Sequence, residues 1–175
     1  MILELHDETL FWLLPVFFMI HDFEEIIMIR PWLDRNGDAL RARFPAAAAK
    51  MISSTGNLST NAFAALVAVE FIALSAVAFL AAEYRCVHLW SGFLIAFLIH
   101  IVMHVAQFVA WRGYVPAVLT CAPAIIYGTV AIDLSAERGF LSSPRVIIFT
   151  LVAFALIGFI FSAGARLAKK FDRFA

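Results

Sequence analysis

Long apolar stretches separated by shorter polar connections make up most of this chain. The stretches cover residues 9–30, 60–82, 87–111, 114–133 and 144–168. Each is close to the roughly 20 residues that a helix needs to cross the hydrocarbon core of a bilayer. None shows the alternation of a barrel strand, and a helix satisfies its own backbone hydrogen bonds in lipid. The pattern therefore predicts an all-α fold, in which residues 1–175 form a single integral membrane domain, a polytopic bundle of five transmembrane helices.

The composition supports a membrane protein. Hydrophobic residues make up 63% of the 175 positions and charged residues only 15%, and the mean hydropathy is +0.92. A soluble domain is about half apolar and about a quarter charged, and a core this small could not bury the excess. The net charge is zero, so we expect no nucleic-acid partner. Cys86 and Cys121 lie far apart, which predicts neither a disulfide framework nor a thiolate metal site.

The charges of the connections predict the orientation. Residues 1–8 carry acidic side chains, so we expect no cleavable signal peptide, which would begin with a basic segment. Basic residues follow the first, third and fifth stretches: Arg30, Arg35, Arg41, Arg43, Lys50, Arg112, Arg166, Lys169, Lys170 and Arg173. Under the positive-inside rule the N-terminus lies outside and the C-terminus lies in the cytoplasm. We predict a multi-pass protein of the bacterial inner membrane.

Two segments bear on packing. The long connection over residues 31–59 contains an alanine run that predicts a short helix at the membrane interface. In the last stretch, small residues at Gly158, Ser162 and Ala165 would let another helix approach closely. These small residues are as consistent with packing inside one chain as with a homodimer.

Ionisable residues inside the apolar stretches are the candidate functional groups, because each costs on the order of 3 kcal/mol at the centre of a bilayer. The first stretch contains the run His21-Asp22-Phe23-Glu24-Glu25. Positions three and four apart share a helix face, so His21 lies beside Glu24 and Glu25. Asp22 is rotated by about 100° from His21 and is the weaker candidate.

The second and third stretches carry further polar groups at a similar depth. Glu70 lies in an apolar run, and His100 and His104 share one helix face. A rise of about 1.5 Å per residue places these groups roughly 10–16 Å from the cytoplasmic end of their helices. We predict six metal ligands in one layer: His21, Glu24, Glu25, Glu70, His100 and His104. Asn57, Asn61 and Gln107 are predicted to orient these ligands or to bind water beside them.

The ligand types indicate the chemistry. Imidazole and carboxylate without thiolate suit iron, manganese or zinc. Three histidines and three glutamates exceed the needs of one tetrahedral zinc, so we predict two divalent metal ions bridged by carboxylates, with iron preferred to zinc or manganese. The preferred function is a di-iron oxidoreductase acting on a hydrophobic or lipid-like substrate. A zinc-dependent membrane hydrolase, with Glu24 or Glu25 as general base, is one alternative. A metal-ion or proton transporter, or a structural network of polar groups, are others.

The run from His21 to Glu25, together with His100 and His104, resembles the family of bacterial membrane proteins named for its HXXEE motif. The resemblance extends over the whole chain, because members of that family are small and cross the membrane several times. It implies that His21, Glu24 and Glu25 are functional. It implies no particular reaction, because the family has no established activity.

Overall fold

The computed structural model describes the backbone of residues 5–51 and 58–171, and the side chains of residues 5–49 and 58–163. This part of the chain is all-helical and contains no strand. Its helices are α1 (Asp7–Arg43), α2 (Pro45–Met51), α3 (Thr60–Tyr84), α4 (Val87–Trp111), α5 (Cys121–Glu137) and α6 (Arg145–Phe171). The predicted all-α fold is confirmed, and α2 coincides with the short helix predicted in the long connection.

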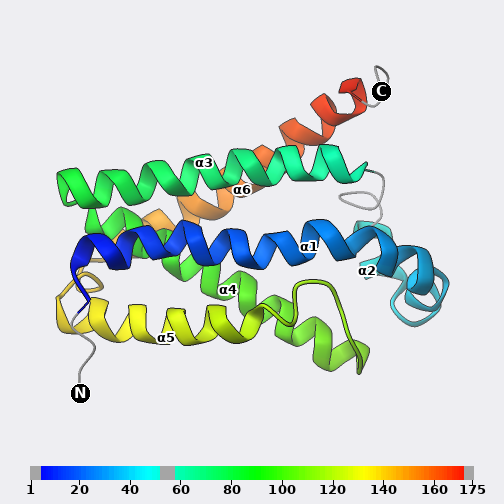
Figure 1. The fold of residues 1–175 in the computed structure, drawn as a ribbon, viewed down its shortest axis with the longest axis horizontal. Helices are drawn as coiled ribbons and strands as arrows, with labels where there is room; N and C mark the ends of the chain where they lie inside the picture. The colour runs from blue at the N-terminus through cyan, green and yellow to red at the C-terminus, as the bar shows by residue number, and fades with distance from the viewer. Residues whose placement is uncertain (1–4, 52–57, 172–175) are drawn as a thin grey trace.

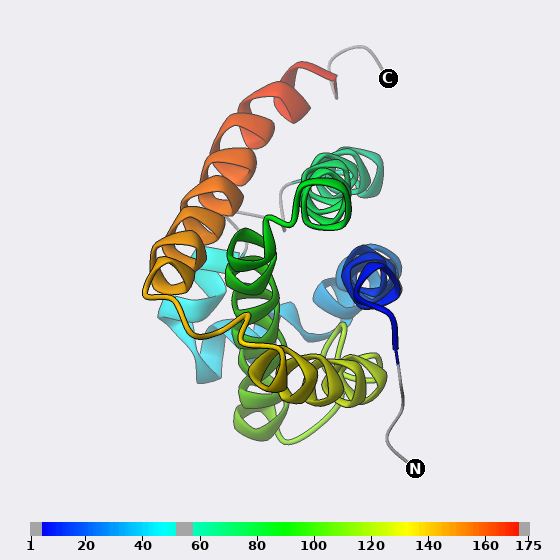
Figure 2. The same ribbon diagram turned by 90° about the vertical axis from the view of Figure 1, so that its left-hand side faces the viewer.

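The five long helices run back and forth along one axis, so the start of α1 and the end of α6 lie at opposite ends of the bundle (Figure 1). Viewed along this axis, α4 lies in the middle, with α5 and α6 on either side of it and with α1 and α3 beside them (Figure 2). Helix α4 contacts each of the other four long helices, and α1 contacts α3, α4 and α5. A polar side chain on the inner face of α1 or α4 is therefore surrounded by protein.

The end of the bundle at the start of α1 is closely packed. Trp90 of α4 and Phe11 of α1 are fully buried, and the Trp90 indole donates a hydrogen bond of 3.2 Å to the Phe11 carbonyl. The Tyr127 hydroxyl donates similarly to the Leu10 carbonyl. Gly92 brings α4 against α6, since a Cβ built there would lie 2.6 Å from Cβ of Phe149. This packing fixes how α1, α4 and α6 lie against one another at that end of the bundle.

The prediction of five membrane-spanning helices is wrong for two of them. Only α3, α4 and α6 are long and apolar enough to cross a membrane in the described part of the chain. Helix α1 falls short because Asp22, Glu24 and Glu25 interrupt its apolar stretch. Helix α5 begins at Cys121 rather than at residue 114, because residues 113–120 form a non-helical segment. Its 17 residues span about 25 Å, short of the roughly 30 Å hydrocarbon core.

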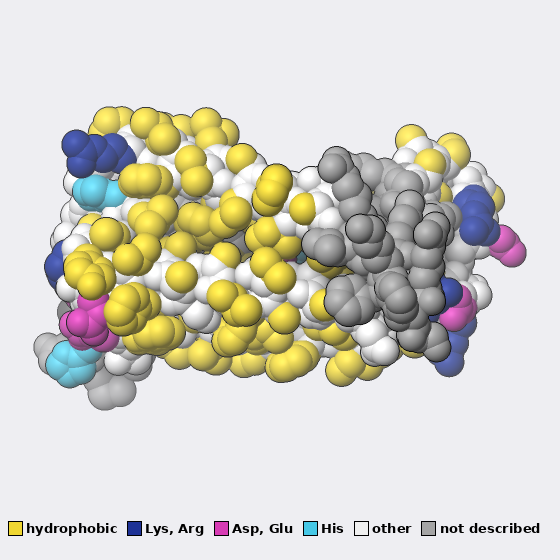
Figure 3. Space-filling model, turned by 90° about the horizontal axis from the view of Figure 1, so that it is seen from above, with side chains coloured by type: hydrophobic (Ala, Val, Ile, Leu, Met, Phe, Trp, Pro, Cys, Tyr) yellow, Lys and Arg dark blue, Asp and Glu magenta, His cyan; other side chains and the backbone are white. Residues whose placement is uncertain are grey.

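The surface agrees with a membrane environment. Large apolar side chains such as Ile72, Val102 and Ile147 are about two-thirds exposed on α3, α4 and α6. Hydrophobic side chains cover the middle of the molecule, and the charged side chains lie towards its two ends (Figure 3). A soluble protein rarely exposes so much contiguous apolar surface. The three apolar helices are thus compatible with a membrane protein.

Candidate metal centre

Three histidines from two helices come together in the middle of the bundle. His100 and His104 lie one turn apart on α4, and His21 faces them from α1. The Nε2 atoms of His100 and His104 are 3.2 Å apart. One ring nitrogen from each of the three histidines lies within 4.8 Å of the others. His21 is fully buried and His104 is 5% exposed, so this cluster, here called the histidine group, is shielded from solvent. Three neutral imidazoles with converging nitrogens can hold a transition-metal ion.

A second set of ligand atoms adjoins the first and shares His100 with it. Asp22, Glu25 and His100 each offer one atom within 4.8 Å of the other two, and we call this set the carboxylate group. Asp22 is 4% exposed, and its Oδ2 atom has no hydrogen-bond partner among the described residues. Oε2 of Glu25 lies 4.0 Å from Nε2 of His104, which joins the two groups. A buried carboxylate oxygen without a partner is costly, and a bound cation would compensate it.

The structure places Asp22, the weaker candidate from the sequence, among the residues that could hold a metal ion. Its side chain is rotated away from that of His21, as expected from the helix, but α1 is flanked on more than one side by other helices. A rotation of about 100° carries Asp22 from one buried environment into another rather than out to the surface. Sharing a face with His21 was too strict a criterion for a helix packed inside a bundle.

Glu70 faces the same region from α3 but belongs to neither group. Its side chain is 7% exposed, and its Oε1 atom has no hydrogen-bond partner in the described part of the chain. Glu70 lines a partly enclosed cavity of about 120 Å³ together with Asp22, Glu25 and His100. These four polar residues form one wall of that cavity.

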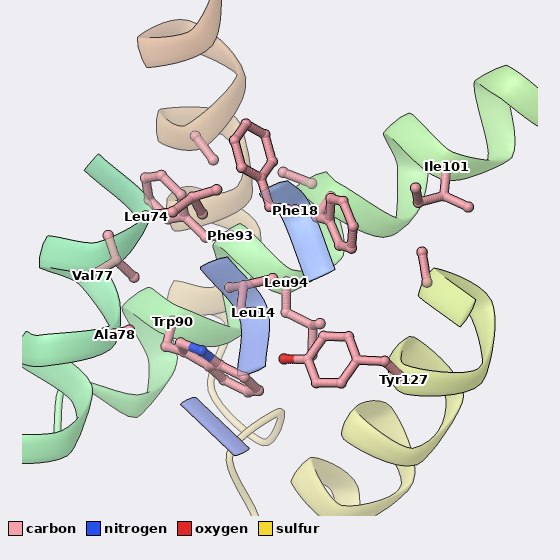
Figure 4. Close-up of a cluster of buried hydrophobic side chains, with 14 of the residues drawn as sticks. Leu14, Phe18, Leu74, Val77, Ala78, Trp90, Phe93, Leu94, Ile101 and Tyr127 are labelled. Carbon is pink, nitrogen blue, oxygen red and sulfur yellow. The ribbon is translucent and has the colours of Figure 1, made fainter. Parts of the chain in front are cut away.

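The other walls of the cavity are apolar and come from four helices. They include Phe18 of α1, Leu74 of α3, Phe93 of α4 and Phe161 of α6. Figure 4 shows Phe18, Leu74 and Phe93 gathered from three of these helices above the close-packed core. Seen from the side of α3 and α6, the surface is hollowed between the two helices (Figure 3). A small apolar molecule in this cavity would lie directly against the carboxylate group.

Glu24 has a different environment from the one that the sequence suggested. Both of its carboxylate oxygens accept hydrogen bonds from the segment between α4 and α5. Oε1 accepts from the Tyr114 hydroxyl at 2.9 Å and from the Leu119 amide at 3.4 Å. Oε2 accepts from the Thr120 amide at 2.8 Å and from the Thr120 hydroxyl at 2.7 Å. Glu24 belongs to neither ligand group, and its oxygens are occupied in holding this segment.

Two of the three residues predicted to surround the ligands are described by the structure. Asn61 and Gln107 are exposed and belong to neither group. Asn57 lies outside the described residues. Thr120, which the sequence did not single out, does lie beside a ligand, since its hydroxyl is 3.3 Å from Nδ1 of His21. Pro116 and Pro123 were the only sign that the predicted fourth span was irregular there.

The arrangement offers two kinds of coordination side by side. The histidine group is rich in nitrogen, whereas the carboxylate group has two oxygen ligands and one nitrogen ligand. Neither contains a thiolate, and the described cysteines Cys86 and Cys121 are not members of either group. Such donor sets suit iron, manganese or zinc. A neutral imidazole has one lone pair to offer, so His100 could serve both groups at once only by losing its second ring proton and binding one ion through each nitrogen.

Comparison with known proteins gives a family for this chain but no individual relative. No curated protein and no solved structure matches it. A family model described as a protein of unknown function with an HXXEE motif matches residues 12–132, from α1 to near the end of α5.

The motif residues are His21, Glu24 and Glu25 of α1. His21 belongs to the histidine group, Glu25 belongs to the carboxylate group, and Glu24 holds the segment between α4 and α5. Since the matched residues include every member of both ligand groups and cover more than half of the sequence, the chain belongs to the HXXEE-motif family, whose function is unknown.

Proposed function

We propose that this protein is a membrane metalloenzyme whose centre holds two neighbouring divalent metal ions. The observation that carries the proposal is the pair of ligand groups that share His100. A polar cluster that served only to stabilise the fold would be hydrogen-bonded within itself. Here, buried atoms of His21, Asp22 and Glu70 lack partners among the described residues.

Iron is the metal that we favour, with manganese or zinc as the alternatives. Five ligands of mixed nitrogen and oxygen type are more than one tetrahedral zinc ion requires. Helical bundles that project carboxylates and histidines inward from facing helices are known to hold pairs of iron or manganese ions. Bound here, a pair of iron ions would supply dioxygen activation, with electrons from an external donor.

The substrate that we propose is hydrophobic or lipid-like. The cavity beside the carboxylate group has apolar walls on all sides except that of the polar residues. Its volume of about 120 Å³ is close to that of an apolar cavity of about 150 Å³ that holds one benzene ring. It therefore suits the end of an alkyl chain rather than a whole lipid. The hollow between α3 and α6 is the proposed entry (Figure 3).

The proposed location is the inner membrane of a bacterium, with the N-terminus outside, an orientation in which α1 and α5 run along the bundle beside the three apolar helices without meeting the length and hydropathy of a free span (Figure 1). In this orientation the end of α1 that carries Arg35, Arg41 and Arg43 faces the cytoplasm, as the positive-inside rule requires. Arg43 donates hydrogen bonds to the carbonyls of Trp111 and Ala110, so the ends of α1 and α4 meet, and Arg112 directly after α4 adds a basic residue there. A homodimer formed through α6 stays a prediction.

If zinc is the metal, the same centre would activate a bound water for hydrolysis. Glu25 is then the proposed general base, because both oxygens of Glu24 are already engaged by the segment between α4 and α5. An assay of hydrolysis and of oxidation with each metal restored would separate these two versions.

Metal analysis of the detergent-purified protein tests the proposal. Wild type is expected to carry two ions per chain. His104→Ala removes a ligand of the histidine group alone, Asp22→Ala removes one of the carboxylate group alone, and His100→Ala removes a ligand of both. We expect about one ion in each of the first two variants and none in the third.

The matched control is Gln107→Ala, a change at an exposed position on α4 near the histidines. It should keep both ions. Wild type without stoichiometric metal would refute the proposal. Ion flux in proteoliposomes that Glu70→Gln abolishes would favour the transporter instead.

A further inference from the structure

The Thr120 hydroxyl lies between Glu24 and His21. Its Oγ1 atom is 2.7 Å from Oε2 of Glu24 and 3.3 Å from Nδ1 of His21. It is also 3.1 Å from the carbonyl oxygen of Ala117. A threonine hydroxyl has one hydrogen to donate and can accept further hydrogen bonds. The direction of that one hydrogen decides what Thr120 does for His21.

The hydrogen of this hydroxyl points away from His21. An ionised carboxylate and a backbone carbonyl can only accept, so contact with either Glu24 or Ala117 uses the hydrogen of Thr120. The hydroxyl oxygen can then meet Nδ1 of His21 only as an acceptor. This contact requires a hydrogen on Nδ1 of His21 and leaves Nε2 of the neutral ring with a free lone pair.

The free nitrogen is the one placed for a ligand. Nε2 of His21 is buried and has no hydrogen-bond partner among the described residues. The His21 ring lies 5.2 Å and 4.9 Å, between ring centroids, from the rings of His100 and His104. Histidines that bind metals are commonly held in one tautomer by a hydrogen bond to the other ring nitrogen.

We propose that Thr120 is a positioning residue, which Glu24 holds in place so that His21 keeps its hydrogen on Nδ1 and presents Nε2 to a metal ion. The inference rests on the proposed metal centre for its purpose. The predicted tautomer of His21 depends only on its contact with Thr120 and does not require a bound metal.

The segment that carries Thr120 is anchored from α1 at several points. Glu24 accepts from the backbone amides of Leu119 and Thr120, so the carboxylate holds the main chain as well as the hydroxyl. The Trp32 indole donates a hydrogen bond of 2.8 Å to the Tyr114 carbonyl. Since Glu24 follows His21 by three residues, both side chains lie on one face of α1 and can reach the same threonine. The spacing of the histidine and the first glutamate of the motif is thereby explained.

The experiment compares three variants by metal affinity. Thr120→Val keeps the shape of the side chain without the hydroxyl, and Thr120→Ser keeps the hydroxyl. Thr129→Val is the matched control, because among the described residues the hydroxyl of this exposed α5 residue bonds only to the Ile125 carbonyl of its own helix. With Co²⁺ titrated against its visible absorption, we expect Thr120→Val to weaken binding by about 10- to 100-fold. Thr120→Ser and Thr129→Val should stay within about threefold of wild type.

A second readout needs no metal. Nitrogen-15 NMR of the metal-free wild type, with labelled histidine assigned through His21→Gln, reports which ring nitrogen of His21 carries the hydrogen. We expect hydrogen on Nδ1 in wild type and in Thr120→Ser, and a mixture of tautomers in Thr120→Val. Hydrogen on Nε2 in wild type would overturn the inference, as would equal Co²⁺ affinities of Thr120→Val and wild type. If wild type bound no metal, the proposed function would fail while the tautomer remained measurable.

Discussion

Replacing Glu24 with glutamine is expected to destabilise the metal-free protein, because Glu24 holds the segment between α4 and α5. Its carboxylate accepts four hydrogen bonds, two on each oxygen. Glutamine has nearly the same size but keeps one acceptor oxygen, and its amide nitrogen would face two donors. Hydrogen bonds to a charged group contribute roughly 1.5–3 kcal/mol each, and Glu24 is partly exposed, so the lower value applies. The loss of two bonds predicts a decrease in the free energy of unfolding of about 3 kcal/mol.

The assay is thermal unfolding of the detergent-solubilised protein in the presence of a chelator. For a chain of this size, about 3 kcal/mol corresponds to a fall in Tm of roughly 6–12 °C. Tyr114→Phe removes a single bond to Glu24 and should cost about half as much. Glu83→Gln, at an exposed position on α3, is the matched control and should shift Tm little.

This reasoning would be refuted if Glu24→Gln shifted Tm no more than Glu83→Gln did. If Glu24 were a metal ligand instead, its replacement would spare the metal-free protein and reduce metal binding. The chelator arm therefore separates a carboxylate that holds the chain from one that holds an ion.

Three further outcomes are expected from the packing and the buried charges. Gly92→Ala should lower the free energy of unfolding by about 1–3 kcal/mol, since a Cβ there meets the backbone and Cβ of Phe149. Gly158→Ala should raise the free energy of unfolding by about 0.5–1 kcal/mol, because a Cβ there meets nothing within 4 Å. Chemical denaturation of both variants measures the difference. Asp22→Asn should shift Tm little in chelator and should reduce the increase in Tm on adding metal, because it removes one ligand of the carboxylate group. Ala73→Phe, which fills the cavity from α3, should leave the metal content unchanged. It should also prevent a diazirine-labelled fatty acid from cross-linking to residues inside the bundle. Unchanged cross-linking would contradict the proposed substrate site.

The sequence alone predicted the features that depend on neighbouring residues along one helix. Helices α3, α4 and α6 follow from uninterrupted apolar runs, and these are the helices that meet the length and hydropathy of a membrane span. The pairing of His100 with His104 follows from the four-residue spacing on one helix face. The meeting of His21 with these two histidines was predicted from their similar depth in the bundle, and the structure brings the three together.

What only the tertiary structure decided concerns groups whose environment is set by distant parts of the chain. Whether Asp22 is buried depends on which helices flank α1, and a helical periodicity does not contain that information. The role of Glu24 depends on a non-helical segment some 90 residues later, which the hydropathy pattern assigned to a helix. Thr120 has no sequence signal of its own, since a threonine in an apolar stretch is unremarkable until a carboxylate and an imidazole face it from another helix. Periodicity and hydropathy describe how one segment meets its surroundings, and the ligand groups arise where several segments meet one another.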